Sequence, residues 1–407
     1  KKYENTLKGK KGVEYRVINT YGQDFGIDKE ADNIAEVSGE NLFLTIDYKL
    51  QFEVEQLLKG YKGAAICMNP RNGEVLAIAS APDYSLDEFI GFLPQETWDK
   101  WNEDKILINR ALYGTYGPAS IYKLVAGIMF IEDNEFSVDK KIFCNGSYRL
   151  EDKSRPEGFI NKRCWKEEGH GSVNLNEAIM QSCNVYFYDM ILKYQDNNPY
   201  IINVLSNYAN RVGFNKKTGI GLFESNGIIP DSDYMENTEE GKSWAKRGEM
   251  TNLIIGQGAN LVTPIQIVNF VNLIATNGKT FKPKLVLSES SIPFKVEFRN
   301  NTWNEMQSAM YSVVNNEKGT AYMLKNDNVN IYGKTGTLQL GALNDSTSNN
   351  QNSLFAGYLE KDGEMMSLVV VIEEIDKNSK TISKKISKSI FDYYVSNNLD
   401  YNKKEIK

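Results

Sequence analysis

Three short polar motifs in this chain carry residue types that can activate a serine for acyl transfer. They are Ser120-Ile-Tyr-Lys123, Ser182-Cys-Asn184 and Lys334-Thr-Gly336, in that order along the chain. A lysine three residues after a serine on a helix lies on the same face, so its amine can take the hydroxyl proton. The second serine can pass a proton to a leaving group, and the Lys-Thr-Gly segment offers a cation, a hydroxyl and close backbone to an anion. Together the motifs predict a serine acyl-transfer site.

A lysine base fits this site better than a histidine base. His170 is the only histidine, and no Gly-x-Ser-x-Gly elbow lies near it. Lys123 must be partly neutral to act, and we expect burial and the neighbouring Lys334 cation to lower its pKa. The N–H groups of Ser120 and Thr337 are expected to form an oxyanion hole. Each motif alone is weak, and Ser-x-x-Lys alone is more often an ordinary surface turn.

Composition limits the class of protein. The chain has 407 residues, a hydrophobic content of 41% and a formal net charge of −6, which suits one large domain with a smaller attachment. No basic stripe with interleaved aromatics is present, so nucleic-acid binding is set aside. No run reaches the roughly 18 apolar residues of a membrane span. The first residue is Lys1 rather than Met, so we expect either a soluble protein or one whose anchor was removed.

The order of predicted elements indicates an α+β fold, with an antiparallel sheet built from both ends of the chain and a helical region between them. Residues 1–40 read as a linker or the remnant of a preceding domain, and residues 41–400 as the main domain. The predicted strands are 42–46, 64–68, 75–79, 331–338, 354–359 and 366–373. The predicted helices begin near residues 47 and 120 and cover about 174–194, 264–276, 301–314 and 381–397. The polar stretches 343–352 and 376–386 read as loops.

The context of the three motifs resembles class B penicillin-binding proteins, and is most similar to their elongation-type branch and its sporulation relatives. The resemblance covers about residues 40–375. It is carried by the segments Leu44-Thr-Ile-Asp47, Ala64 to Ala77, Asn109-Arg-Ala-Leu, Tyr116 to Lys123, Gly169-His-Gly171, Gln181 to Phe187, Gly256-Gln-Gly258, Leu261-Val-Thr-Pro264 and Lys334-Thr-Gly-Thr337. One departure is Ala119, where the family usually has glycine. The resemblance implies the penicillin-binding transpeptidase fold, with residues 1–40 as a short stub of the pedestal domain.

The family resemblance also implies a reaction. Ser120 would be acylated by the penultimate D-Ala of a peptidoglycan stem peptide, and irreversibly by β-lactam antibiotics. Lys123 would be the base, Ser182 with Lys334 would relay the proton, and Asn184 would hold the acyl chain. Thr335 and Thr337, with Gly336 between them, would bind the carboxylate. A membrane glycan polymerase would be the partner, at the extracytoplasmic face of the membrane, where an N-terminal segment absent from this chain would anchor the protein.

A second cluster of functional residue types suggests a metal. Cys144, Cys164, His170 and Cys183 fall within one forty-residue segment that includes the chain's only histidine. Three sulfurs and an imidazole suit tetrahedral zinc, and some elongation-type relatives look to hold zinc near this place. We expect a structural zinc ion and no organic cofactor. A Cys144–Cys164 disulfide, a buried core Cys183 and a loop-capping His170 remain alternatives.

Two other functions share these motifs. A serine β-lactamase would need a deacylating base such as a glutamate, which the sequence does not locate, and is usually a shorter chain. A β-lactam sensor domain would be acylated only to signal. We therefore expect a serine D,D-transpeptidase first, with these two as alternatives.

Overall fold

The computed structural model describes residues 2–132, 137, 139–152, 156–198, 200–238, 246–299, 301–339, 350–376 and 379–399. The chain divides into two compact units, one of residues 1–45 with 285–290 and one of residues 46–284 with 291–407. The first unit contains helix α1 (Glu4–Leu7) and the antiparallel pair β1 (Arg16–Ile18) and β2 (Asp24–Ile27). The strand predicted over residues 42–46 is wrong, because Leu44 makes only an isolated bridge to Val286.

The second unit is built on a five-stranded antiparallel sheet in the order β11-β12-β13-β3-β4. Its strands are β3 (Gly63–Met68), β4 (Val75–Ala81), β11 (Asn330–Gln339), β12 (Asn350–Lys361) and β13 (Glu364–Asp376). Strand β13 pairs with β3, so the sheet joins the two ends of the chain as the sequence predicted. The fold class, α+β with a central antiparallel sheet and a helical region, is confirmed.

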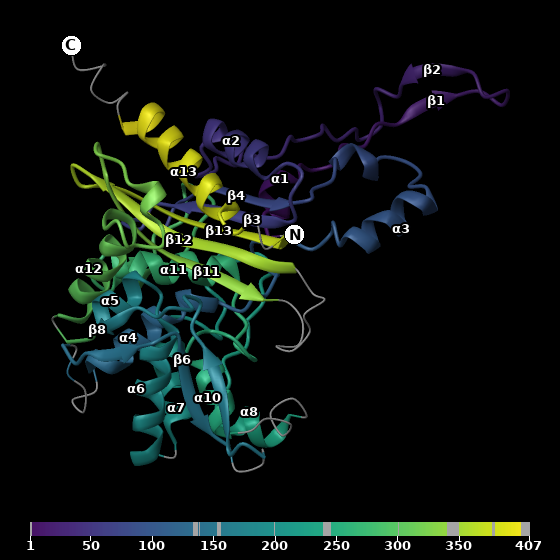
Figure 1. Cartoon of the computed structure of the whole chain (residues 1–407). Helices are drawn as coiled ribbons and strands as arrows, with labels where there is room; N and C mark the ends of the chain where they lie inside the picture. The colour runs from purple at the N-terminus through teal and green to yellow at the C-terminus, as the bar shows by residue number, and fades with distance from the viewer. Residues whose placement is uncertain are drawn as a thin grey trace. The chain divides into compact units, whose positions relative to one another are not determined.

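Helices cover both faces of this sheet. Helices α2 (Tyr48–Leu58) and α13 (Ile382–Tyr394) pack on one face, and α11 (Pro264–Ala275) packs on the other (Figure 1). Every residue of β3 is therefore buried, although antiparallel strands often keep one face in water. Helix α11 begins at the N-cap Thr263 with proline at the first helical position, as this pair of residues indicates, and Gln266 completes a capping box with Thr263.

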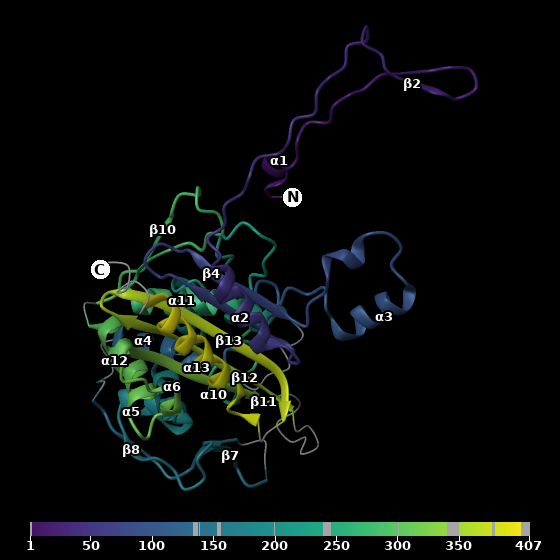
Figure 2. The ribbon, with the colours of Figure 1, turned by 90° about the horizontal axis from the view of Figure 1, so that it is seen from above.

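The remaining helices and short strands lie mostly on the α11 side of the sheet (Figure 1). The helices are α4 (Lys123–Glu132), α5 (Leu175–Met180), α6 (Asn184–Asn197), α7 (Ile201–Arg211), α8 (Ser232–Asn237), α10 (Lys246–Leu253) and α12 (Thr302–Asn315). Short antiparallel pairs join β5 (Ile142–Cys144) to β8 (Gly171–Val173), β6 (Ser147–Glu151) to β7 (Phe159–Arg163), and β9 (Lys279–Phe281) to β10 (Pro293–Lys295). Helix α3 (Gln95–Asp104) and the 3-10 turn η1 (Leu86–Phe89) stand to one side of the sheet in both views (Figures 1 and 2).

Two predicted boundaries differ from the structure in ways that matter for the site. The helix predicted over about 174–194 is two helices, α5 and α6, separated at residues 181–183. The helix predicted from near Ser120 begins with a 3-10 turn, η2 (Ala119–Ile121), before α4. In both places the departure from a regular α-helix falls on a predicted catalytic serine. The predicted loop at 343–352 lies outside the described residues except for 350–352, which belong to β12.

Helix α13 is followed by a π-helical turn, η5 (Val395–Leu399), and a 3-10 turn, η3 (Tyr322–Leu324), precedes β11. Within the described residues, no helix combines the length and the apolar character that crossing a bilayer requires.

Candidate active site

Ser120 lies in the 3-10 turn η2, which packs against the edge strand β11. Lys123 follows this turn as the first residue of α4, three residues after Ser120. The N–H of Ala119 donates to Gly256 O at 2.8 Å, and Ala119 has a φ of 47°. This left-handed conformation explains why glycine suits the position and why Ala119 is a strained departure.

Lys123 opens helix α4 and is fully buried, with 0% exposure. Its Nζ donates to Ser182 O at 2.8 Å, to Ser182 Oγ at 3.3 Å and to Asn184 Oδ1 at 2.6 Å. Burial lowers the pKa of Lys123 to about 8, against an opposing effect of the nearby cysteines. A buried amine of this kind can lose its proton near neutral pH, as a general base must.

Lys334 reaches the same hydroxyl from strand β11. Its Nζ donates to Ser182 Oγ at 3.1 Å and to Thr335 O at 3.2 Å, and the side chain is fully buried. Burial, and then repulsion from the Lys123 charge, hold the pKa of Lys334 well below its ordinary value. The repulsion is mutual, so it disfavours a second charge on the pair, as the sequence led us to expect for Lys123. Two lysines around one hydroxyl titrate as a pair, in which the first charge disfavours the second.

Ser182 stands between the two lysines because the polypeptide breaks its helix there. Its φ is 55°, and only 6% of the residue is exposed. A non-glycine residue in the left-handed region is held there by its surroundings, and such residues concentrate at active sites. Asn184 starts helix α6 immediately after the break. The structure therefore brings Lys123, Ser182, Asn184 and Lys334 into one hydrogen-bonded group.

Ser120, whose proton Lys123 is expected to take, is not among the hydrogen-bond partners of Lys123 in the described residues. An ammonium has three donors, and the three recorded bonds of Lys123 go to Ser182 and Asn184. Loss of one proton leaves the amine with a lone pair, which can then accept from Ser120. Catalytic hydrogen bonds are often long in the unliganded state and form in the complex.

The N–H of Ser120 is free for the predicted oxyanion hole. The N–H groups of Ala119, Ile121 and Tyr122 bond backbone carbonyls, whereas no backbone carbonyl in the described part of the chain takes that of Ser120. The Thr337 half of the oxyanion hole stays a prediction.

Strand β11 presents the rest of the predicted substrate-binding motif. Thr335 is half-buried and Thr337 is exposed. Gly336 faces the serine turn so closely that an added Cβ would lie 3.3 Å from Ala119 Cβ and 3.2 Å from Leu354 Cβ. Glycine here lets the strand and the nucleophile turn approach each other.

A partly buried ion pair fixes the segment that leads into Ser120. Arg110 Nε lies 3.0 Å from Glu373 Oε1, and the Tyr116 hydroxyl donates to the same oxygen at 2.6 Å. The guanidinium also donates to Lys105 O and Asp104 O. Arg110 and Tyr116 lay within motifs used for the resemblance, but Glu373 on β13 carried no sequence signal that would link it to them.

The four predicted metal ligands converge beneath the Ser182 segment. The donor atoms of Cys144, Cys164, His170 and Cys183 lie within 4.8 Å of one another. His170 Nδ1 is 3.5 Å from the sulfurs of both Cys144 and Cys164. All four cysteines of the chain are unpaired, so the alternative Cys144–Cys164 disulfide is not formed, and Cys67 is buried in β3 outside the cluster.

This donor set fits tetrahedral zinc. With Zn–S near 2.3 Å and Zn–N near 2.0–2.1 Å, a sulfur and a nitrogen ligand of one ion are about 3.5 Å apart. The Cys164 sulfur also accepts from the Asn184 N–H at 3.3 Å. A hydrogen bond from Cys183 lowers the pKa of Cys164 and raises that of Cys183 itself, so Cys164 is the readier thiolate. Thiolate is the form that binds metals.

Trp165 is a neighbour of the site that the sequence reasoning missed. Its Nε1 donates to Gln181 O at 3.0 Å and to Ser182 O at 3.1 Å. Its ring meets the His170 ring edge to face at 5.3 Å, and the side chain is 58% exposed. The indole therefore braces the Ser182 segment from the side of the sulfur cluster.

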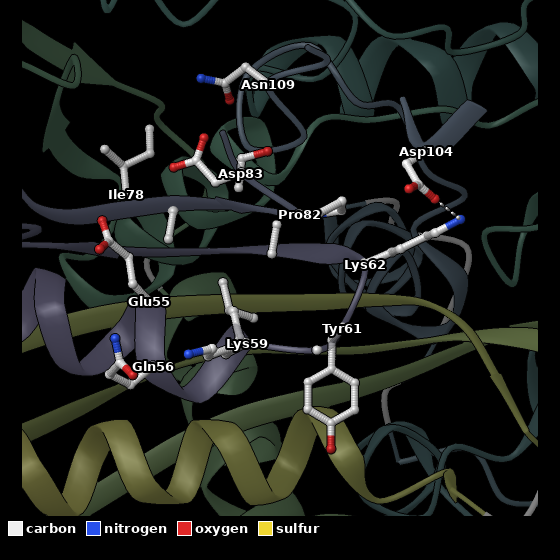
Figure 3. Close-up of a pocket in the computed structure, with 15 residues that line it drawn as sticks. Glu55, Gln56, Lys59, Tyr61, Lys62, Ile78, Pro82, Asp83, Asp104 and Asn109 are labelled. Carbon is white, nitrogen blue, oxygen red and sulfur yellow. Dashed lines mark ion pairs between the residues drawn. The ribbon is translucent and has the colours of Figure 1, made fainter. Parts of the chain in front are cut away.

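A separate cavity of about 690 Å³ lies at the opposite edge of the sheet, between α2 and β4. Figure 3 shows Glu55, Lys59, Tyr61, Asp83 and Asn109 around it, with an ion pair between Lys62 and Asp104. None of the predicted site residues lines this cavity.

Comparison with known proteins finds relatives that are penicillin-binding proteins or peptidoglycan transpeptidases. Residues 63–392 match the penicillin binding protein transpeptidase domain. The peptidoglycan D,D-transpeptidase MrdA of Haemophilus influenzae is 28% identical over 98% of this chain and 62% of its own length. Penicillin-binding protein 3 of Bacillus subtilis is 28% identical over 91% of this chain and 52% of its own length. The chain thus spans about three fifths or less of the curated relatives it matches.

Solved structures agree with this assignment. PBP2 in the Helicobacter pylori complex of PBP2 and MreC superposes with a TM-score of 0.81, at 27% identity, over 97% of this chain and 71% of that one. Pseudomonas aeruginosa PBP2 in complex with WCK 5153 superposes with a TM-score of 0.77, at 26% identity, over 90% and 78%. The relatives confirm the resemblance to class B penicillin-binding proteins of the elongation type. The chain belongs to the penicillin binding protein transpeptidase domain family.

Proposed function

We propose that this chain is a serine D,D-transpeptidase that cross-links peptidoglycan stem peptides. The observation that carries the proposal is the convergence of Lys123 and Lys334 on the Ser182 hydroxyl, beside the turn that presents Ser120. Relatives named peptidoglycan D,D-transpeptidase support the substrate class.

In the first half-reaction, Ser120 Oγ attacks the carbonyl of the penultimate D-Ala while neutral Lys123 takes the hydroxyl proton. The tetrahedral intermediate collapses as the C–N bond to the terminal D-Ala breaks. The leaving nitrogen receives a proton from the Ser182 hydroxyl, which is replenished by the lysine that carries the proton. The products are an ester on Ser120 and free D-Ala.

In the second half-reaction, an amine of a neighbouring stem peptide attacks the ester carbonyl. The amine gives up its proton through the same Ser182–lysine group, and the bond to Ser120 Oγ breaks as the serine regains its hydrogen. A β-lactam forms the same ester, but its leaving nitrogen stays tethered by the opened ring. Thr335 and Thr337 would bind the carboxylate in both cases, and that anion would favour the charged forms of the lysine pair.

The β-lactamase alternative requires a base that activates water against the ester. Within the described residues, no carboxylate hydrogen-bonds Lys123 or Ser182. Lys123 donates to Ser182 and Asn184, and the Ser182 hydroxyl also accepts from Lys334. We therefore expect a long-lived acyl-enzyme. A sensor domain would be acylated as well, but it would not turn over a peptide.

The test combines a covalent label with turnover. The purified chain is incubated with benzylpenicillin and the adduct is mapped by mass spectrometry of peptides. We expect one adduct on Ser120 in the wild type and no adduct in Ser120→Ala. In Ser182→Ala the adduct should still form on Ser120, but more slowly. A stem pentapeptide with an amine acceptor should yield free D-Ala and cross-linked product. Labelling of Ser120→Ala refutes the proposal, and labelling of the wild type without any peptide turnover favours a sensor.

We propose, second, that Cys144, Cys164, His170 and Cys183 hold a structural zinc ion. Zinc would supply a cross-link among β5, the segment after β7 and the start of α6, in addition to the backbone bonds from Cys164 N to Gly146 O and from His170 N to Cys144 O. Cys183 stands between Ser182 and Asn184, so a ligand bond at this residue would hold both catalytic side chains against Lys123. The 3.5 Å spacings of His170 Nδ1 support this proposal.

Metal analysis tests the zinc proposal directly. We expect about one zinc per chain, lost in Cys144→Ser and retained in Cys67→Ser, the matched control with a buried cysteine outside the cluster. Exchange of the metal for cobalt should give a thiolate-to-cobalt absorption band that Cys144→Ser weakens. A chelator should lower the melting temperature of the wild type. A metal-free wild type whose melting temperature ignores the chelator would refute the proposal.

We propose, third, that the native protein works at the extracytoplasmic face of the membrane beside a glycan polymerase. The supporting observations concern relatives: one is solved with MreC, and another belongs to a peptidoglycan synthase complex that coordinates polymerization and crosslinking. Co-purification of the full-length protein with a polymerase of its own cell would test this proposal, and recovery from the cytosol alone would refute it.

A further inference from the structure

A hydroxyl outside the three motifs contacts the motif that would bind the substrate carboxylate. Thr320 lies between helix α12 and strand β11, and its Oγ1 is 2.8 Å from the Oγ1 of Thr335. Its backbone N–H donates to Met180 O at 3.3 Å, two residues before Ser182. Thr320 is thus fixed between the Ser182 segment and the Lys-Thr-Gly strand.

A lysine from the other face of the sheet reaches the same residue. Lys384 lies in the first turn of α13, is half-buried, and donates from Nζ to Thr320 O at 3.1 Å. The Ser383 hydroxyl bonds that of Ser353 at 2.7 Å, and Ser353 pairs with Thr337 across the β11–β12 ladder. The start of α13 is therefore tied to the stretch of β11 that carries the carboxylate-binding threonines.

Proton counting assigns a direction to the Thr320–Thr335 hydrogen bond. A hydroxyl has one proton to donate and two lone pairs to accept with. A bound carboxylate only accepts, so Thr335 must donate its proton to that carboxylate. The bond between the threonines then has Thr320 as donor and Thr335 as acceptor. A residue that donates to Thr335 leaves the Thr335 proton available for the anion.

We propose that Thr320 and Lys384 are positioning residues for the terminal carboxylate of the acyl donor. Thr320 orients the Thr335 hydroxyl toward the anion, and Lys384 holds Thr320 in place and adds a positive charge behind the subsite. This inference rests on the proposed function, because it takes Thr335 as a carboxylate ligand. It adds two residues that none of the three motifs contains, and it assigns them to anion recognition rather than to proton transfer.

Charge and burial of Lys384 support this role. Burial lowers the pKa of the Lys384 amine, because removing the ammonium from water disfavours its charged form. The Lys384 ammonium donates to a backbone carbonyl, that of Thr320, and a carbonyl does not neutralise its positive charge. Lys385, the next residue, is exposed and offers a matched control.

The test compares an acyl donor that has the carboxylate with one that lacks it. Benzylpenicillin and its methyl ester are reacted with the wild type and with Thr320→Val, Thr320→Ser, Lys384→Met, Lys384→Arg and Lys385→Met. The dissociation constant of the initial complex and the acylation rate constant are separated by varying the antibiotic concentration. Melting temperatures show whether each variant is folded.

We expect Thr320→Val and Lys384→Met to weaken benzylpenicillin binding by about tenfold, as for loss of a hydrogen bond near a charged group. The acylation rate constant and the reaction with the ester should change by no more than about twofold, because the chemistry is untouched. Thr320→Ser and Lys384→Arg keep the hydroxyl or the cation and should bind almost as the wild type does, and Lys385→Met should be unchanged.

Equal losses for acid and ester would show a purely structural role and overturn the inference. Unchanged benzylpenicillin binding in both Thr320→Val and Lys384→Met would overturn it as well. Either result, with the wild type acylated on Ser120, leaves the proposed function standing. A wild type that is not acylated on Ser120 overturns the proposed function and the inference with it.

Discussion

Asn184 sets the protonation of the base, and its replacement should shift the pH dependence of acylation. Its Oδ1 accepts the shortest hydrogen bond of the Lys123 ammonium, 2.6 Å, while the other two go to Ser182. A hydrogen bond to a charged group contributes about 1.5–3 kcal/mol. Since about 1.4 kcal/mol corresponds to one pH unit, losing it should lower the pKa of Lys123, which burial has already lowered to about 8.

The sign follows from which form acts. Acylation needs the neutral amine, so its rate rises with pH through the pKa of the base. In Asn184→Ala the midpoint of this rise should move down by about one pH unit. In Asn184→Asp a carboxylate faces the ammonium, so the midpoint should move up. The absolute rates should fall in both variants, because Asn184 also holds the acyl chain.

The assay is the second-order rate constant for benzylpenicillin acylation, measured from about pH 5.5 to 9.5 to bracket the base. Asn176→Ala and Asn176→Asp are matched controls, because the Asn176 side chain donates to the exposed Ser308 hydroxyl between α5 and α12 and, among the described residues, does not contact Lys123. Their midpoints should equal that of the wild type. A midpoint that is the same in Asn184→Ala, Asn184→Asp and the wild type would refute the assignment of Lys123 as the base. A shift of both variants in one direction would refute the hydrogen-bond argument.

Two further changes test the scaffold around Ser120. Ala119→Gly should raise the free energy of unfolding by up to about 1 kcal/mol, because alanine is strained at a φ of 47° that glycine adopts freely. Urea denaturation measures this change, and a lower stability would show that Ala119 is not strained. Glu373→Gln should lower the free energy of unfolding by about 3 kcal/mol, because it leaves Arg110, 3% exposed, without its counter-charge; an unchanged urea midpoint would show that the pair contributes nothing net. Each change should leave the site of penicillin labelling at Ser120.

Much of the fold could be read from local sequence. The alternation and length of apolar runs located β3, β4, β11, β12 and β13, and the Thr263-Pro264 cap located the start of α11. These features depend on neighbouring residues only, because helix and strand periods and caps are local. The strand predicted at 42–46 failed because an apolar run becomes a strand only where a partner strand lies alongside it, and Leu44 has a single bridging contact.

The chemical parts of the site were also visible in the sequence, since residue type and order identified Ser120, Lys123, Ser182, Asn184, Lys334 and the cysteine cluster. Local sequence did not show that the helix breaks before Asn184, because Gln181-Ser-Cys183 is not a helix-breaking sequence. Packing of Ser182 between two buried lysines holds its backbone in the left-handed region.

The sequence by itself determined which groups this protein can use: a serine nucleophile, two lysines, an amide and three sulfurs with one imidazole. Only the tertiary structure decided which of them meet. Lys334 shares the Ser182 hydroxyl with Lys123 because β11 lies against the turn that carries Ser120, and Lys384 reaches Thr320 because the start of α13 is tied to β12 beside β11. These contacts join residues that are far apart along the chain, and their geometry is fixed by the closing of the sheet and the packing of helices on it, which no local pattern encodes.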